Sequence, residues 1–185
     1  AAGTFSRCAT ALCAAALVTA CHSARVAPAS QSSMADTARI RSDIGYLSSD
    51  ALEGRGTGTP GNDSAAAYLA REYERLGLTK LVRAGSCPAM RPGVRECVSG
   101  RATYLQSFQA RSVEAAHAGM PGELPTQNVV AMQAGTDPAL RGQPIVIGAH
   151  FDHLGRSSFN ALDPQAGNAI RPGADDNASG TAAVL

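Results

Sequence analysis

The hydrophobic pattern of residues 36–77 predicts two amphipathic helices. Apolar residues recur at helical spacing over residues 36–48, and Asp36 can cap the first turn. A second apolar face runs over residues 65–76 and ends at Gly77, a residue type that commonly terminates helices. The candidate caps of this second helix are Asn62, Asp63 and Ser64.

Further along the chain the pattern predicts strands. Residues 103–109 alternate in polarity, and residues 127–132 contain adjacent β-branched residues. Residues 144–149 form a short, continuous apolar run, which is typical of a strand buried on both faces of an α/β sheet. Helices, then strands, then a buried strand together predict an α/β fold with three α/β/α layers.

Residues 1–35 have the pattern of an export leader. Arg7 precedes an uncharged run, residues 8–20, which is shorter than the about 20 residues of a membrane-spanning helix and fits the apolar part of a secretory signal. We therefore interpret residues 1–21 as an export or lipoprotein signal. Residues 22–35 are rich in Ser, Ala and Pro and are interpreted as a tether.

The end of this leader resembles a lipoprotein cleavage site. Residues 18–21, Val-Thr-Ala-Cys, are similar to the lipobox of bacterial lipoproteins, which predicts lipid attachment at Cys21. Ordinary cleavage near Ala20 or Ala24, without a lipid, is the alternative. We expect an exported protein, in the bacterial periplasm or at the outer membrane as a lipoprotein, and otherwise secreted. Any membrane contact would then pass through the lipid anchor alone.

The cysteines outside the leader predict a disulfide. Cys87 and Cys97 are the two that remain, and they flank a turn-rich loop. An exported protein folds in an oxidising compartment, where such a pair can form a structural bridge. A zinc or redox pair is the alternative, and it is disfavoured because no second Cys or His follows at ligand spacing.

Charge and glycine content exclude two classes of partner. The 16 basic residues nearly balance the 15 acidic ones and form no cluster, so a nucleic-acid surface is not expected. Residues 52–61, LEGRGTGTPG, contain four glycines and a proline and are predicted to form a loop. No Gly-Lys-Ser/Thr sequence follows, so we interpret the loop as a structured turn near a substrate or as plain surface rather than a phosphate loop.

Candidate chemistry begins where the predicted buried strand ends. His150, Asp152 and His153 follow residues 144–149 directly, at the carboxyl end of the strand, where open α/β sheets place ligand sites. His150 and Asp152 would share a face if the strand continued, and a carboxylate beside a zinc-binding imidazole often holds its other ring nitrogen. A His–Asp pair that caps a strand end is the alternative.

A second acidic cluster follows in Pro172–Gly180. Asp175 and Asp176 are adjacent like charges, which repel each other unless a cation or protons lie between them. A divalent metal would relieve this repulsion. Helix capping by one Asp or by Asn177 is the alternative, since these residue types favour helix starts.

Four segments together resemble a known family. LSSDALEGRGTGTPG, TQNVVA, IVIGAHFDHLG and PGADDNASGTAAVL, within Ala38–Leu185, are similar in sequence and order to the co-catalytic di-zinc aminopeptidases. That family includes bacterial leucyl aminopeptidases and glutamate carboxypeptidases. The resemblance implies a three-layer α/β/α fold with a mixed, mostly parallel central sheet. Residues 36–185 would be the N-terminal part of its catalytic domain.

The resemblance also implies roles for individual residues. His150 would bind one zinc, Asp176 would bridge two zincs, and Asp152 would orient His150 without touching the metal. Asp175 and His153 have no ligand role in the family's pattern. The implied substrates are peptides.

One departure concerns the rest of the family's site. In the family, three further features follow these motifs: a Glu–Glu pair that supplies the general base and one ligand, another acidic ligand, and a final His. In this sequence the last Glu is Glu123, which precedes the motifs. We therefore expect a truncated catalytic domain that is inactive alone.

The predicted function is a zinc-dependent exopeptidase, an aminopeptidase acting on peptides. The alternatives are a non-catalytic ectodomain of the same fold and a single-zinc, glutaminyl-cyclase-like acyltransferase.

Overall fold

A computed structural model describes three stretches of the chain, residues 35–83, 100–111 and 122–185. Residues 35–185 form one compact unit. Cys21, Cys87 and Cys97 lie outside the described residues, as do the predicted export signal and all but the last residue of the predicted tether, so lipid attachment and the disulfide stay predictions. In the described stretches no helix is both long enough and apolar enough to cross a membrane.

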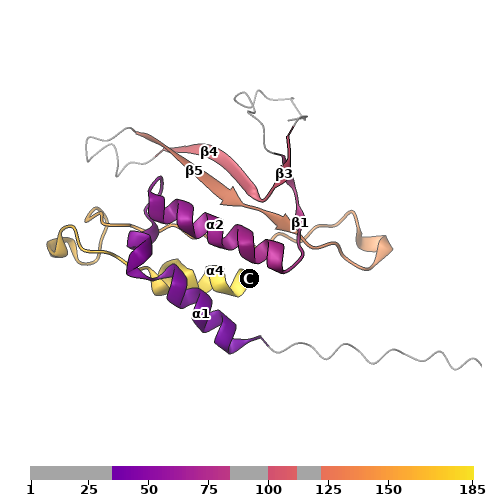
Figure 1. Ribbon diagram of the computed structural model, residues 1–185, viewed down its shortest axis with the longest axis horizontal. Coiled ribbons are helices and arrows are strands. Elements are labelled where there is room, and N and C mark those ends of the chain that lie inside the picture. Colours follow the sequence, from indigo (N-terminus) through magenta and orange to yellow (C-terminus); the bar gives the residue numbers. More distant parts are fainter. Residues whose placement is uncertain (1–34, 84–99, 112–121) are drawn as a thin grey trace, which may run out of the picture. The chain divides into compact units, whose positions relative to one another are not determined.

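The secondary structure consists of short helices and short strands (Figure 1). The helices are α1 (Thr37–Leu47), the 3₁₀ helix η1 (Asp50–Arg55), α2 (Pro60–Arg75), the 3₁₀ helices η2 (Pro138–Leu140) and η3 (Pro164–Ala166), the π-helical segment η4 (Ala174–Ser179) and α4 (Gly180–Val184). The strands are β1 (Thr79–Lys80), β2 (Val82–Arg83), β3 (Ala102–Thr103), β4 (Leu105–Arg111), β5 (Glu123–Val129) and β6 (Ala131–Met132).

The two predicted helices are confirmed, with a different start for the second. The Asp36 side chain accepts hydrogen bonds from two backbone N–H groups of the first turn of α1, as predicted. Helix α2 begins earlier than predicted, because Thr59 rather than Asn62 or its neighbours is the cap and Pro60 occupies the first turn. Proline suits that position, since its missing N–H would have no helical partner there. Gly77 follows the helix end with φ +70°, as predicted for a terminator.

The strands form three antiparallel pairs, β1 with β6, β2 with β3, and β4 with β5. The longest pair runs from Leu105 opposite Val129 to Arg111 opposite Glu123. Strand structure is thus confirmed within residues 103–109 and 127–132, with bounds shifted by a few residues. In Figure 1 the β4–β5 pair lies beside α2, and β5 contacts that helix.

The prediction of a buried strand at residues 144–149 is wrong for this structure. These residues belong to no strand, and Ile145, Val146 and Ile147 are 88%, 91% and 75% exposed. A strand needs a neighbour to pair its backbone groups, and none of the described strands runs beside this run. The three-layer arrangement around a mostly parallel sheet therefore stays a prediction.

A small apolar core holds the helices together. Leu47, Leu52, Ala65 and Ala178 are almost fully buried, and Phe151 packs against them from the segment after the exposed run. Leu47 ends α1, Ala65 lies in α2, and Ala178 lies in η4, so the core joins elements from both ends of the described sequence. Because Phe151 and Ala178 lie within the two predicted metal motifs, packing brings these motifs together.

A polar network also joins α1 to α2. Asp43 is 1% exposed, forms an ion pair with Arg39 at 2.8 Å, and accepts a hydrogen bond from the hydroxyl of Tyr68. Arg39 also pairs with Glu72. Burial raises the pKa of Tyr68 to about 12, and the hydrogen bond to Asp43 adds to this effect.

Candidate metal centre

His150 and Asp152 are placed by the residue between them. Phe151 packs its side chain against the core, so the side chains before and after it are directed away from the core, as in an extended segment. His150 is 55% exposed and Asp152 is 44% exposed. Because polar residues flank the apolar Phe151, the imidazole of His150 and the carboxylate of Asp152 lie on the same side of the chain.

Asp176 is placed by a turn that precedes α4. Its φ of −109° and ψ of 91° are extended rather than helical, and its peptide bond to Asn177 is cis. The residue that caps α4 is Ser179, whereas the Asn177 side chain accepts a hydrogen bond from the backbone N–H of Gly180 at 3.1 Å. The hydroxyl of Thr181, one residue further, donates to the backbone carbonyl of His150 at 3.0 Å and ties the two motifs together.

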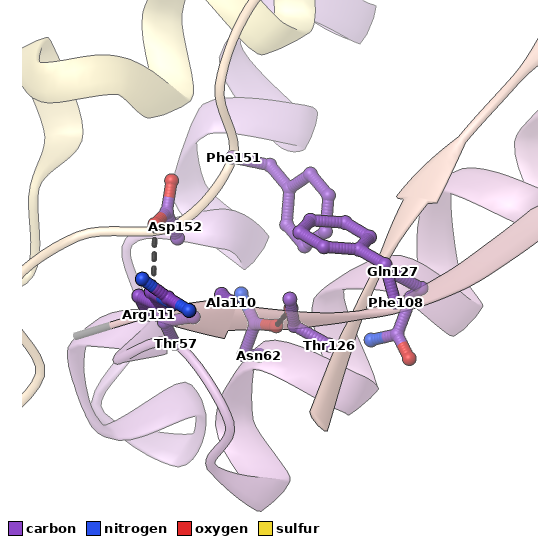
Figure 2. A pocket seen from close by; sticks show the side chains of 9 residues that line it. All are labelled: Thr57, Asn62, Phe108, Ala110, Arg111, Thr126, Gln127, Phe151 and Asp152. Atoms are coloured by element: carbon purple, nitrogen blue, oxygen red, sulfur yellow. Dashed lines mark hydrogen bonds between the residues drawn. The ribbon is translucent and has the colours of Figure 1, made fainter. Parts of the chain in front are cut away.

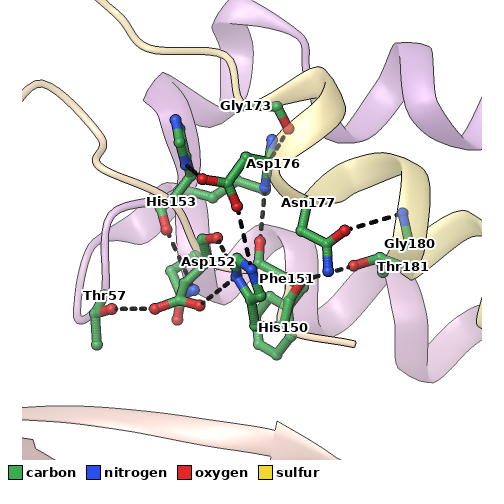
Figure 3. A network of polar contacts seen from close by, with 12 residues as sticks. Thr57, His150, Phe151, Asp152, His153, Gly173, Asp176, Asn177, Gly180 and Thr181 are labelled. Atoms are coloured by element: carbon green, nitrogen blue, oxygen red, sulfur yellow. Dashed lines mark hydrogen bonds and ion pairs between the residues drawn. The ribbon is translucent and has the colours of Figure 1, made fainter. Parts of the chain in front are cut away.

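The side chains of these motifs meet in one cluster (Figure 3). His150 Nε2 lies 3.2 Å from Asp176 Oδ1. His150 Nδ1 faces Asp152, at 3.1 Å from its backbone carbonyl oxygen and 3.4 Å from its carboxylate. An N–H at Nδ1 would satisfy both acceptors, which leaves the lone pair of Nε2 directed toward Asp176.

This geometry fits the ligands of a zinc ion. Nitrogen and oxygen ligands lie about 2.0–2.2 Å from zinc, so two ligands of one tetrahedral ion are roughly 3.3 Å apart. The 3.2 Å between His150 Nε2 and Asp176 Oδ1 agrees with that separation. Within the described residues, no three His, Cys, Asp or Glu side chains come together in a group that could hold a metal. The described part of the chain thus offers a pair of ligands.

The two residues predicted to be bystanders differ in their surroundings. Only the backbone carbonyl of Asp175 is engaged, by the hydroxyl of Ser179, and its carboxylate joins no other described residue. His153 is closer to the centre than the sequence indicated, since its Nδ1 lies 3.5 Å from Asp176 Oδ2 and its side chain is only 15% exposed. Burial lowers the pKa of His153, an effect that nearby Arg55 reinforces and Asp176 opposes.

Two residues of the glycine-rich loop support the centre, and no role for either could be predicted from the sequence. The hydroxyl of Thr57 donates to Asp152 Oδ2 at 2.7 Å, so Asp152 is itself held in place. Arg55 is fully buried and donates to backbone carbonyls of both motifs. The loop also runs beside the first motif, with a parallel bridge between Gly56 and His153. Of our two readings of this loop, the structured turn rather than plain surface agrees with its position.

A cavity of about 320 Å³ borders the centre on the side of Thr57 and Asp152 (Figure 2). It is open to solvent, and the strands β4 and β5 form part of its wall. The lining residues are Thr57, Asn62, Phe108, Ala110, Arg111, Thr126, Gln127, Phe151 and Asp152.

A candidate metallohydrolase centre is thus formed by the imidazole of His150, the Asp176 carboxylate that faces its Nε2 and the Asp152 carboxylate that faces its Nδ1. A family model described as Peptidase family M28 matches residues 128–185, the segment that contains both motifs. This segment is therefore similar to peptidase family M28, whose members are metallopeptidases and generally depend on zinc. No curated protein matches the chain, and no solved structure matches it.

Proposed function

We propose that this chain carries part of the site of a zinc-dependent aminopeptidase, which removes N-terminal residues from peptides. His150 and Asp176 bind zinc, with Asp176 as the bridge between two ions in the complete site. Asp152 orients His150 from behind. The proposal is a specific form of the metallopeptidase function that the similarity to family M28 supports.

The observation that carries the proposal is the position of the two nitrogens of His150. Nδ1 faces the oxygens of Asp152, and Nε2 faces Asp176 Oδ1 at 3.2 Å. A histidine that merely caps a strand end has no need of a carboxylate on each side. A zinc-binding histidine needs one acceptor to fix its tautomer and one open nitrogen toward the metal and its other ligands.

The chain's own residues contribute orientation and charge. Bound zinc would polarise the peptide carbonyl and lower the pKa of water to about 7, which supplies a nucleophile at neutral pH. Asp176 has two carboxylate oxygens and is 68% exposed, so it can contact two cations. Asp152, held by Thr57, keeps the proton of His150 on Nδ1 and so keeps Nε2 available.

The test compares two adjacent aspartates in the full-length protein. Asp176→Ala should abolish zinc-dependent release of N-terminal amino acids from peptides, whereas Asp175→Ala should retain it, because the Asp175 carboxylate joins no other described residue. A peptide with an acetylated N-terminus should resist cleavage. Unchanged turnover by Asp176→Ala would overturn the proposal. Cleavage of the acetylated peptide would show that the free amine is not recognised.

Elemental analysis of the same protein separates the proposal from its rivals. Two zinc ions per chain, lost together in Asp176→Ala, are expected because Asp176 contacts both ions. One zinc and no release of amino acids would favour the acyltransferase alternative. Absence of zinc in the wild-type protein would favour a non-catalytic ectodomain.

A further inference from the structure

Arg55 is the most deeply buried charged residue of the described chain. Its side chain is fully buried, within a turn where its own φ is +51°. The guanidinium donates hydrogen bonds to four backbone carbonyls, those of Leu47, Phe151 at 2.7 Å, Pro172 at 2.7 Å and Gly173 at 2.9 Å. A long charged side chain is rarely buried so completely, and such a position calls for a specific role.

The partners of Arg55 are unusual for a buried cation. Buried arginines commonly pair with a carboxylate, but no ion pair joins Arg55 to any residue in the described stretches. Burial lowers the pKa of Arg55, and the carboxylates that oppose this effect are Asp152 and Asp176. Arginine stays charged in proteins, so a positive charge lies behind the two acidic residues of the metal centre.

The carbonyls that Arg55 holds belong to the two metal motifs. Phe151 lies between His150 and Asp152 in the sequence, and Gly173 begins the turn that presents Asp176. The guanidinium is planar and its N–H groups have fixed directions, so it sets the distance between the carbonyls that it binds.

The backbone of the same residue adds a further link. The carbonyl of Arg55 accepts a hydrogen bond from the N–H of His153 at 3.2 Å. Arg55 thus forms hydrogen bonds to the first motif through both its main chain and its side chain. Its guanidinium also forms a hydrogen bond to the second motif.

We propose that Arg55 is the positioning residue of the metal centre, which fixes the separation of His150 Nε2 and Asp176 Oδ1 and thereby sets the affinity for zinc. The inference rests on the proposed function, since it assumes that these two atoms bind zinc. Its physical basis is preorganisation: ligands that are already at the right separation lose less entropy when the ion binds.

Arg171 provides a matched control. It is 6% exposed and also donates to backbone carbonyls, those of Asp163, Gly167 and Ala169, and it pairs with the Asp163 carboxylate. None of these groups belongs to the segments that carry His150 or Asp176. Removal of Arg171 should therefore cost stability without changing the ligand separation.

The experiment measures zinc affinity and stability separately in the full-length protein. Zinc affinity comes from competition with a chromogenic chelator, and stability comes from urea unfolding of the metal-free protein. Arg55→Met should weaken zinc binding about tenfold or more, the usual effect of losing a group that orients a ligand. Arg171→Met should change zinc affinity less than about twofold, even if its urea unfolding midpoint falls as much as that of Arg55→Met. Arg55→Lys, which keeps the charge but loses the planar fork, should give an intermediate affinity.

Each outcome decides between distinct claims. Wild-type zinc affinity in folded Arg55→Met, or an equal loss in Arg171→Met, would overturn the positioning role. Should Arg55→Met not fold, Arg55→Lys carries the test, and wild-type affinity in that variant would overturn the role of the planar fork. Failure of the wild-type full-length protein to bind zinc would instead refute the proposed function.

Discussion

His150 Nε2 lies 3.2 Å from Asp176 Oδ1, although the two residues come from separate motifs. The contact depends on the core, because Phe151 follows His150 and Ala178 lies just after Asp176, and both side chains pack in the same apolar cluster. The hydroxyl of Thr181 adds a hydrogen bond to the backbone of His150. Apolar packing thus creates the polar contact on which the proposed zinc binding depends.

The two histidines of the first motif should differ in their effect on zinc binding. His150→Ala should remove measurable zinc binding by the chain, because Nε2 of His150 faces Asp176, the other proposed ligand. His153→Ala should retain affinity within a few-fold of wild type, since His153 supports Asp176 from 3.5 Å without being a ligand. Chelator competition measures both. Loss of zinc binding in His153→Ala with retention in His150→Ala would contradict the prediction and make His153 the ligand.

Thr57 should affect zinc binding through Asp152, and Asp152 through His150. Asp152→Asn should weaken zinc binding about tenfold, because it removes the negative charge beside Nδ1 of His150 while the backbone carbonyl of residue 152 stays in place. Thr57→Val removes the hydroxyl that donates to Asp152 and should cause a smaller loss, which Thr57→Ser restores. Zinc titration of the three variants tests the order. A larger loss in Thr57→Val than in Asp152→Asn would contradict it.

Gly173→Ala should distort the turn that presents Asp176. A Cβ on Gly173 would lie 2.4 Å from the carbonyl oxygen of Asp176 and 2.6 Å from the ring of His153, and φ is +58°. We expect weaker zinc binding together with a loss of about 1–3 kcal/mol in the free energy of unfolding. Gly167→Ala is the control, since its φ is +55° and no atom lies within 4 Å of the added Cβ. Equal zinc affinities in the two variants would argue against the clash.

Tyr68 should make stability depend on pH in the alkaline range. Its pKa is raised to about 12 in the folded protein, against about 10 for an ordinary tyrosine. Between these values the folded state holds a proton that the unfolded state has lost, so stability falls as the pH rises from about 10 to about 12. Urea unfolding at pH 8 and pH 11 should show a smaller fall for Tyr68→Phe than for wild type. Identical falls would rule out this contribution.

Local features of the fold could be predicted from the sequence because neighbouring residues determine them. The cap at Asp36, the terminator at Gly77 and the longer strands all follow from short patterns. Residues 144–149 show the limit of this approach. Their apolar pattern is typical of a buried strand, but a strand also needs a partner, and that requirement lies outside the run itself.

The candidate site was predictable in part for the same reason. His150, Asp152 and Asp176 stand out as chemically competent residues in short motifs, and the structure brings them together. Arg55 and Thr57 could not be assigned, because their partners Phe151 and Asp152 lie 96 and 95 residues away in the sequence. Only the fold shows that a glycine-rich turn near one end of the described sequence supports candidate ligands near the other.

X-ray absorption at the zinc edge of the zinc-loaded chain tests the central claim most directly. It reports the atoms bound to the metal. The account predicts one imidazole nitrogen with oxygen neighbours at about 2.0–2.2 Å, and the same imidazole contribution in His153→Ala, which should still bind zinc. A sulfur neighbour at about 2.3 Å, or loss of the imidazole contribution in His153→Ala, would contradict it.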